Sequence, residues 1–227
     1  MRPPASQDRQ IGQVRLASRV LLITDPSYAA AHVDAVVAVV SGALGPLFAV
    51  QLRDKGASAG DLRMRAVALR ALTRAGGASF IVNGSPELAA EVGADGVHLP
   101  GFAQDPSILG RARAIVGPSG TLYVPVHTRH EVLLARDGGA DALLVSPIFD
   151  SPGKGPARGV AALAEARALA PLSIYALGGI DASHVAACHR AGADGVAIIR
   201  ALLDAPDPVA TARALISPWT RTAQPSP

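Results

Sequence analysis

The residues best suited to chemistry begin with an alternating set that follows an apolar run. Gln51, Arg53 and Lys55 come directly after residues 47–50, and alternate side chains of an extended chain share one face. An amide and two cations would therefore point together. A guanidinium offers a planar fork of donors and an ammonium a mobile charge, a combination that suits an anionic ligand. The alternative is a solvated loop between a strand and a helix, which these residues alone do not exclude.

A glycine pair later in the chain is typical of a phosphate-binding turn. Gly178 and Gly179 follow the apolar run 173–177, and a helix is expected to start at Ile180-Asp181. Backbone N–H groups exposed at a helix N-terminus attract phosphate. The alternative is a tight turn with no ligand, which glycine also permits.

His127 ends the apolar run 123–126, where an imidazole can transfer protons near neutral pH. His127 and His130 together also suggest a metal, but no cysteine or carboxylate lies at ligand spacing, so acid–base chemistry is favoured. His98 stands inside an apolar strand and is expected to be a hydrogen-bonded core residue. Cys188 is interpreted as a buried helix thiol.

The loop 146–156 is long and rich in glycine and proline, as a lid or a phosphate-approach loop often is. Lys154 is its only cation. A solvated surface lysine is the alternative.

The composition limits the kinds of protein to consider. The chain has 227 residues, of which 49% are hydrophobic and 17% charged, so a sizeable core is expected and disorder is excluded for most of the chain. The formal net charge is only +3, without a basic run, and 4% of the residues are aromatic, which argues against nucleic-acid binding. A single cysteine permits no intrachain disulfide and suggests a reducing cytoplasm.

No segment predicts export or membrane insertion. Residues 1–18 are polar and lack the apolar core of a signal peptide. The longest uncharged run, 35–50, contains Gly42, Gly45 and Pro46 and is shorter than the ~18 residues that a membrane span needs. This run predicts a helix, a turn and a strand, and a cytoplasmic protein is expected.

Apolar runs alternate with helical patterns along the chain. Three Gly-Ala-Asp repeats, which begin at Gly93, Gly139 and Gly192, each precede a strand, and each glycine stands at a helix C-cap. The repeats lie 46 and 53 residues apart, about two βα units each. The predicted strands cover 20–24, 47–52, 79–82, 96–99, 121–126, 142–145, 173–177 and 195–199. Such a series predicts an α/β fold with a single closed (β/α)8 TIM barrel, and an open doubly wound sheet is the alternative.

The barrel is expected to cover 19–216, with a flexible N-terminal lead over 1–18 and a flexible C-terminal tail over 217–227. Ligands of such barrels bind at the carboxyl ends of the strands, where the loops after the last two strands and a short extra helix hold phosphate. The prediction therefore gathers polar residues around one mouth: Thr24, Asp25, Gln51, Arg53, Lys55, Asn83, His98, His127, Ser146, Lys154, Gly178, Gly179 and Arg200.

From about Leu21 to Leu203, the chain resembles the thiamine phosphate synthase and TenI family of (β/α)8 barrels. Six motifs in one order argue against a chance match. They are Gln51-Leu52-Arg53-Asp54-Lys55, Ala94-Asp95-Gly96-Val97-His98-Leu99, Val126-His127-Thr128, Ser146-Pro147-Ile148-Phe149 with Lys154, Leu177-Gly178-Gly179-Ile180, and Gly195-Val196-Ala197.

The resemblance implies two substrate sites. A thiazole phosphate would place its phosphate on Gly178, Gly179 and the backbone near Ile199 and Arg200. Synthases of the family also bind a pyrimidine diphosphate with magnesium, which implies diphosphate contacts from Gln51, Arg53, Lys55, Asn83 and Lys154. Ser151 is a further candidate for binding phosphate or substrate. TenI-type members are tautomerases that aromatise a thiazole carboxylate phosphate, which implies proton transfer by His127, with Lys154 as the second catalytic candidate.

The chain departs from the synthase pattern at the magnesium ligands. Gly84 stands where the family has an aspartate, and an ungapped count places Ala103 at the second ligand, so that Asp105 could serve only from a longer loop. Pro125 replaces a serine that precedes the histidine by two residues, and residues 151–153 replace a Thr-x-Thr segment. Magnesium prefers carboxylate oxygens together with substrate phosphate, so the loss of carboxylates should weaken diphosphate activation.

The leading hypothesis is therefore a TenI-like thiazole tautomerase that works without a cofactor. The first alternative is a magnesium-dependent thiamine phosphate synthase whose metal site uses Asp105 or Asp150. The second alternative is a non-catalytic barrel that binds a ligand or a partner. The expected partner is a small-molecule thiazole phosphate, without nucleic acid or membrane, and the pairing of barrels into a homo-oligomer through apolar helices stays open.

Overall fold

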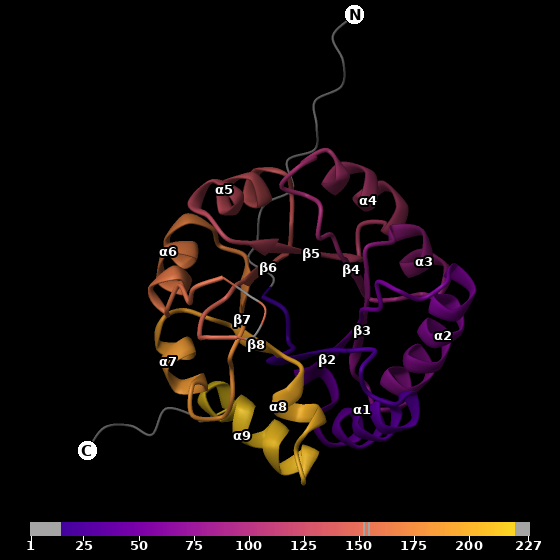
Figure 1. Ribbon diagram of the computed structural model, residues 1–227. Coiled ribbons are helices and arrows are strands. Elements are labelled where there is room, and N and C mark those ends of the chain that lie inside the picture. Colours follow the sequence, from indigo (N-terminus) through magenta and orange to yellow (C-terminus); the bar gives the residue numbers. More distant parts are fainter. Residues whose placement is uncertain (1–14, 152, 154, 221–227) are drawn as a thin grey trace, which may run out of the picture.

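A computed structural model describes residues 15–151, 153 and 155–220. Eight parallel strands pair in chain order and close into a barrel, because β8 pairs with β1 (Figure 1). The closed order confirms the predicted (β/α)8 barrel and excludes the open sheet. The strands are β1 (Val20–Ile23), β2 (Phe48–Leu52), β3 (Ser79–Asn83), β4 (Gly96–His98), β5 (Thr121–Val126), β6 (Ala142–Val145), β7 (Ser173–Leu177) and β8 (Gly195–Ile198).

Helices form a ring outside the strands (Figure 1). Polar caps begin several of them, since Ser58, Ser85 and Thr128 each accept a backbone N–H of the first turn. The predicted N-cap at Ser85 and first helical position at Pro86 are confirmed. The helices are α1 (Ala30–Leu44), α2 (Ala59–Ala75), α3 (Pro86–Glu91), α4 (Ile108–Val116), α5 (Arg129–Asp137), α6 (Ala161–Leu169), α7 (Val185–Arg190), α8 (Arg200–Leu203) and α9 (Pro208–Thr220), with a 3-10 turn at Gly45–Leu47.

The apolar segment after β1 forms a helix, a turn and a strand, as predicted. By length and composition, Ala30–Leu47 is long and apolar enough to cross a membrane. In the fold, Val33, Val36, Val37 and Val40 are buried against the barrel, and α1 packs beside α2 and α9 (Figure 1).

The barrel interior is filled by its own side chains. Tyr123 and Tyr175 pack across it with ring centroids 6.1 Å apart. Gly96 and Gly195 make room for these rings, because a Cβ would lie 3.1 Å from Tyr123 at the first position and 2.8 Å from Tyr175 at the second. Pro125 costs no ladder bond toward β4, since the register of that pair ends at Tyr123.

The Gly-Ala-Asp repeats hold the bottom of the barrel together. Each aspartate accepts the backbone N–H of the preceding odd-numbered strand: Asp95 from Phe80, Asp141 from Leu122 and Asp194 from Ile174, at 2.8 to 2.9 Å. Each also pairs with an arginine of a preceding helix, namely Arg70, Arg113 and Arg167. The repeated motif therefore links a strand to a preceding helix, and this link recurs every two βα units.

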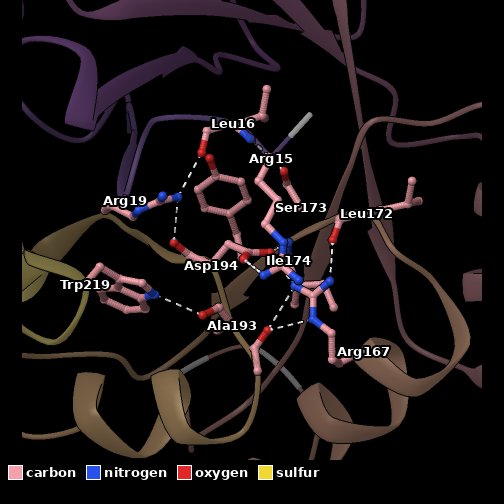
Figure 2. A network of polar contacts seen from close by, with 12 residues as sticks. Arg15, Leu16, Arg19, Arg167, Leu172, Ser173, Ile174, Ala193, Asp194 and Trp219 are labelled. Carbon is pink, nitrogen blue, oxygen red and sulfur yellow. Dashed lines mark hydrogen bonds and ion pairs between the residues drawn. The ribbon is translucent and has the colours of Figure 1, made fainter. Parts of the chain in front are cut away.

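Figure 2 shows that Asp194 lies between Arg167 and Arg15. Leu16 N also donates to Ser173 Oγ at 3.0 Å, and Trp219 Nε1 donates to Ala193 O at 3.0 Å. Residues 15–18, which the sequence assigned to the flexible lead, thus contact the barrel. Helix α9 continues to Thr220, four residues beyond the predicted boundary at 216. The rest of the lead (1–14) and of the tail (221–227) lies outside the described residues.

Candidate active site at the barrel mouth

Three polar side chains from β2, β3 and β4 form one network inside the upper barrel. Asn83 Nδ2 lies 2.9 Å from Gln51 Oε1 and 2.7 Å from His98 Nδ1. Gln51 is fully buried and His98 is 7% exposed. Each amide hydrogen of Asn83 thus has an acceptor, so the network fixes both neighbouring side chains.

The network leaves two buried donors free. His98 Nδ1 accepts from Asn83, so the imidazole proton is on Nε2. Among the described residues, neither His98 Nε2 nor Gln51 Nε2 has a hydrogen-bond partner. Burial, assisted by the charge of Arg53, lowers the pKa of His98 to about 3. The predicted hydrogen-bonded core histidine is confirmed, but its second nitrogen is a neutral donor suited to an acceptor atom of a ligand.

Arg53 is held at the end of β2 through its backbone. Arg53 N donates to Thr24 Oγ1 at 2.9 Å, and Thr24 Oγ1 donates to Arg53 O at 3.3 Å. Hydrogen bonds from Ser27 are the main cause of the lowered pKa of Asp25. The charges of Arg53 and Arg200 lower this pKa further, so both cations lie near the carboxylate. Arg53 therefore lies just beyond the end of β2, beside Thr24 and Asp25.

Lys55 does not continue the predicted alternating face. The strand ends at Leu52, and Asp54 Oδ1 accepts Gly56 N and Ala57 N in a turn. Lys55 is exposed within that turn. The side chain of Asp54 competes with extended structure here, so the expected set of three is reduced to Gln51 and Arg53 at the strand.

The glycine pair and the short helix α8 line a cavity of about 450 Å³, together with Ser151, Ile199 and Arg200. Gly178 and Gly179 have φ values of 103° and 63°. A Cβ on Gly179 would lie 2.4 Å from Asp150 O, because the loop after β6 runs beside the pair. The glycines are thus required both for the turn and for close packing of this loop.

The helix predicted at Ile180-Asp181 begins instead at Val185. Asp181 Oδ1 accepts Ser183 N at 2.8 Å, which favours a turn before the helix. The short helix α8 follows β8 directly and brings its N-terminus to the cavity. The cavity at the last two strands, where a phosphate site was expected, is therefore bordered by α8 rather than α7.

His127 lies at the opposite part of the mouth, at the end of β5. His127 Nδ1 donates to Ser146 O at 2.9 Å, so that Nε2 is the nitrogen of the neutral ring that can accept a proton. The side chain is exposed and lines a cavity of about 480 Å³ with Ser146, Pro147, Gly155, Pro156 and Arg158. His130 is exposed in the first turn of α5, as predicted.

Sequence reasoning overlooked two residues at this mouth. Arg158 lines the His127 cavity, and Tyr28 Oη donates to Asp204 Oδ1 at 2.7 Å beside α8. Burial and Asp204 raise the pKa of Tyr28 to about 12. Neither contact follows a local pattern, although Arg158 was readable as a second cation near the predicted loop. Lys154 lies outside the described residues.

The donors at the mouth do not fit a magnesium site built by the protein. Asp105 accepts from Arg111 Nη2 at 2.6 Å and from Ser107 Oγ at 2.5 Å, so both oxygens are engaged at the start of α4. Gly84 offers no side chain. Within residues 15–151, 153 and 155–220, no three His, Cys, Asp or Glu side chains gather as metal ligands would.

The comparisons with known proteins agree in one family. A family model described as "Thiamine monophosphate synthase" matches residues 20–202. The chain is 40% identical over 200 residues to a thiamine-phosphate synthase of Roseiflexus sp. (strain RS-1), covering 86% of this chain and 83% of the relative. It is 43% identical over 176 residues to a thiamine-phosphate synthase of Methanoculleus marisnigri, covering 76% and 82%.

A solved structure is similar over nearly the same length. It is a thiamine phosphate pyrophosphorylase from Pyrococcus furiosus, with a TM-score of 0.75 and 26% identity, covering 89% of this chain and 96% of that one.

Proposed function

The chain belongs to the thiamine monophosphate synthase family of enzymes, and on that premise we propose that it joins a pyrimidine methyl diphosphate to a thiazole phosphate to form thiamine phosphate. The relatives named thiamine-phosphate synthase favour this reaction over the tautomerase that led the sequence-based hypotheses. The structural feature that supports the proposal is a single mouth with two separate cavities that contain groups suited to anions, namely Gly178, Gly179 and Arg200 in one and Arg158 in the other.

The proposed reaction breaks one bond and forms one bond. The bond between the pyrimidine methylene carbon and the diphosphate oxygen breaks, and its electron pair leaves with diphosphate. The lone pair of the thiazole nitrogen then forms the new carbon–nitrogen bond. The site must therefore hold two anionic groups, stabilise charge on the leaving group and align the two rings, without any proton transfer at carbon.

Gln51 and His98 suit the pyrimidine ring better than the diphosphate expected from the resemblance. Both lie deep in the barrel, and His98 is neutral, so their free N–H groups fit acceptor nitrogens of a heteroaromatic ring. Arg53 lies nearer the rim, where a guanidinium suits diphosphate oxygens. Gly178, Gly179 and the start of α8 would take the phosphate of the thiazole.

We assign none of these steps to magnesium. Synthases of this family use magnesium, whereas the described carboxylates of this chain do not gather around a common point. We therefore assign binding and orientation to the side chains above.

The single cysteine, Cys188, is buried in α7 with a pKa raised to about 11 by burial, consistent with the proposed cytoplasmic setting.

His127 favours thiazole tautomerisation as a second candidate. Its unprotonated Nε2 is exposed to a cavity, which is the arrangement that proton transfer from a thiazole carbon requires. Diphosphate displacement has no such requirement. The substitution His127→Ala therefore separates the two reactions: it should abolish tautomerisation and leave most of the thiamine phosphate formation.

The test assays both reactions with the same purified protein. One sample contains the pyrimidine diphosphate and the thiazole phosphate, and chromatography follows thiamine phosphate. A second contains the non-aromatic thiazole carboxylate phosphate, and its ultraviolet spectrum follows aromatisation. Thiamine phosphate in the first sample supports the proposal. Turnover only in the second supports the tautomerase, and tight binding without turnover in either supports a non-catalytic barrel.

A further inference from the structure

Arginines at the two ends of the barrel differ in their partners. At the bottom, Arg70, Arg113 and Arg167 each form an ion pair with an aspartate of the Gly-Ala-Asp repeats. At the mouth, Arg53 and Arg158 have no carboxylate within 4.0 Å among the residues that the structure describes, and the same holds for Arg200. Three guanidinium groups near the mouth are thus without an ion pair among the described residues, although Arg65, which lines the same cavity as Arg53, pairs with Asp34.

The backbone holds Arg158 in a defined position. Arg158 N donates to Pro147 O at 2.9 Å, and Gly159 N donates to Ile148 O at 3.0 Å. These bonds join the end of the long loop after β6 to its beginning. They place Arg158 beside the carboxyl ends of β5 and β6, although ten residues separate it from Ile148 in the chain.

The guanidinium of Arg158 has unused donors. The one hydrogen bond of this guanidinium among the described residues runs from Nη1 to Val126 O at 3.5 Å, which is long. The half-buried side chain lines the same cavity as His127 and Ser146. At the adjacent end of β5, Pro125 has neither a side-chain donor nor a backbone N–H. Arg158 therefore supplies a cation at a strand end that offers no donor from that position.

We propose that Arg158 binds the diphosphate group and stabilises it as the leaving group. This inference rests on the proposed synthase reaction. The other anionic group, a phosphate monoester, is accounted for by Gly178, Gly179 and α8 at a separate cavity. Among the residues that the structure describes, no three metal-ligand side chains gather at the mouth, and a guanidinium stays charged at every physiological pH and binds diphosphate oxygens in pairs.

The test measures binding of inorganic diphosphate by calorimetry, in buffer with a chelator, to the full-length chain and three variants. Arg158→Gln removes the charge, and Arg158→Lys keeps the charge without the planar fork. Arg190→Gln is the matched control, because Arg190 is exposed at the C-terminal end of α7, on the bottom side of the barrel. Thermal unfolding of each variant checks the fold.

Arg158→Gln should weaken diphosphate binding roughly tenfold or more, with a smaller loss for Arg158→Lys and none for Arg190→Gln. Binding of inorganic phosphate should change less than threefold, since we assign it to the glycine-pair cavity. A diphosphate affinity unchanged in a folded Arg158→Gln protein would overturn the inference. Equal losses of affinity for diphosphate and phosphate would also overturn the inference, because they would show that Arg158 acts only through its general charge.

The proposed function is judged by a separate result. Absence of thiamine phosphate formation by the unmodified protein would contradict the synthase reaction, whereas the calorimetric comparison of Arg158 variants does not depend on turnover. If Arg158→Gln loses diphosphate affinity but the unmodified chain shows no turnover, Arg158 is still supported as a diphosphate-binding residue, and the synthase reaction is rejected.

Discussion

Asn83 Nδ2 lies 2.7 Å from His98 Nδ1, and this hydrogen bond places the imidazole proton on Nε2. The ring is buried among β2, β3 and β4 and has a pKa of about 3, chiefly because burial disfavours its charged form. A neutral N–H donor at the floor of the mouth suits a ring nitrogen of the pyrimidine, whereas the cations nearer the rim suit phosphate oxygens.

The neutral state of His98 predicts a pH dependence of stability. The folded-state pKa of about 3 lies below the ordinary value of 6.5, so between these pH values the unfolded chain binds one more proton at this site. The free energy of unfolding should therefore fall as the pH drops below 6.5, with a contribution of up to about 1.4 kcal/mol per pH unit. Urea unfolding between pH 4 and 8 measures it.

The matched variant is His98→Gln, which cannot titrate at this position. Its free energy of unfolding should fall less steeply below pH 6.5 than that of the unmodified chain. Parallel curves for the two proteins would show that His98 binds its proton equally in the folded and unfolded chains, so that its pKa is not lowered by folding.

Gly179 is predicted to tolerate no side chain. Gly179→Ala would place a Cβ 2.4 Å from Asp150 O at a φ of 63°, so the loop after β6 must move and the backbone is strained. The melting temperature should fall by several degrees, as a loss of about 2 kcal/mol implies for a chain of this size. Gly117→Ala is the control, because Gly117 has a φ of 75° but no atom within 4 Å of a Cβ. An equal fall in melting temperature in both variants would show that backbone strain alone causes the effect.

Asp194 is predicted to contribute most among the repeated aspartates. Its side chain is 6% exposed and pairs with both Arg15 and Arg167 (Figure 2). The side chain of Asp95, by contrast, is 43% exposed and pairs with Arg70. Asp194→Ala should lower the free energy of unfolding by about 3 kcal/mol, and Asp95→Ala by about 1 kcal/mol. Chemical denaturation measures both losses. A larger loss for Asp95→Ala than for Asp194→Ala would contradict the role assigned to the aspartates at the barrel bottom.

Asp105 is predicted to be irrelevant to metal binding. Its carboxylate is engaged by Arg111 and Ser107, and the hydrogen bond from Arg111 is the main cause of its lowered pKa. Asp105→Ala should leave the magnesium affinity and the rate of thiamine phosphate formation within about twofold of the unmodified chain. A tenfold loss of magnesium affinity in Asp105→Ala would show that Asp105 is a magnesium ligand.

The sequence predicted the barrel because its signals are local and repeated. Buried strands of a parallel barrel are short continuous apolar runs, and the glycines at 93, 139 and 192 end helices in a left-handed conformation. The role of the following aspartates was not predictable locally, since Arg70 and Asp95 are 25 residues apart and meet only in the closed ring.

Parts of the site escaped prediction for related reasons. Side-chain bonds of Asp54 and Asp181 form turns that displace Lys55 from the strand face and delay the start of α7. Arg158 meets His127 only because backbone bonds close the loop after β6 on itself. The placement of Gln51 in β2 was predictable, since an apolar run that predicts a strand is a local property.

The most direct test of the account is a turnover measurement with the unmodified protein, the pyrimidine diphosphate and the thiazole phosphate in magnesium-containing buffer. Mass spectrometry follows thiamine phosphate, and a coupled assay follows released diphosphate. The account predicts that both products appear in a one-to-one ratio and that neither appears when the thiazole phosphate is omitted. Release of diphosphate without thiamine phosphate, or no release at all, would contradict the assignment as a thiamine phosphate synthase.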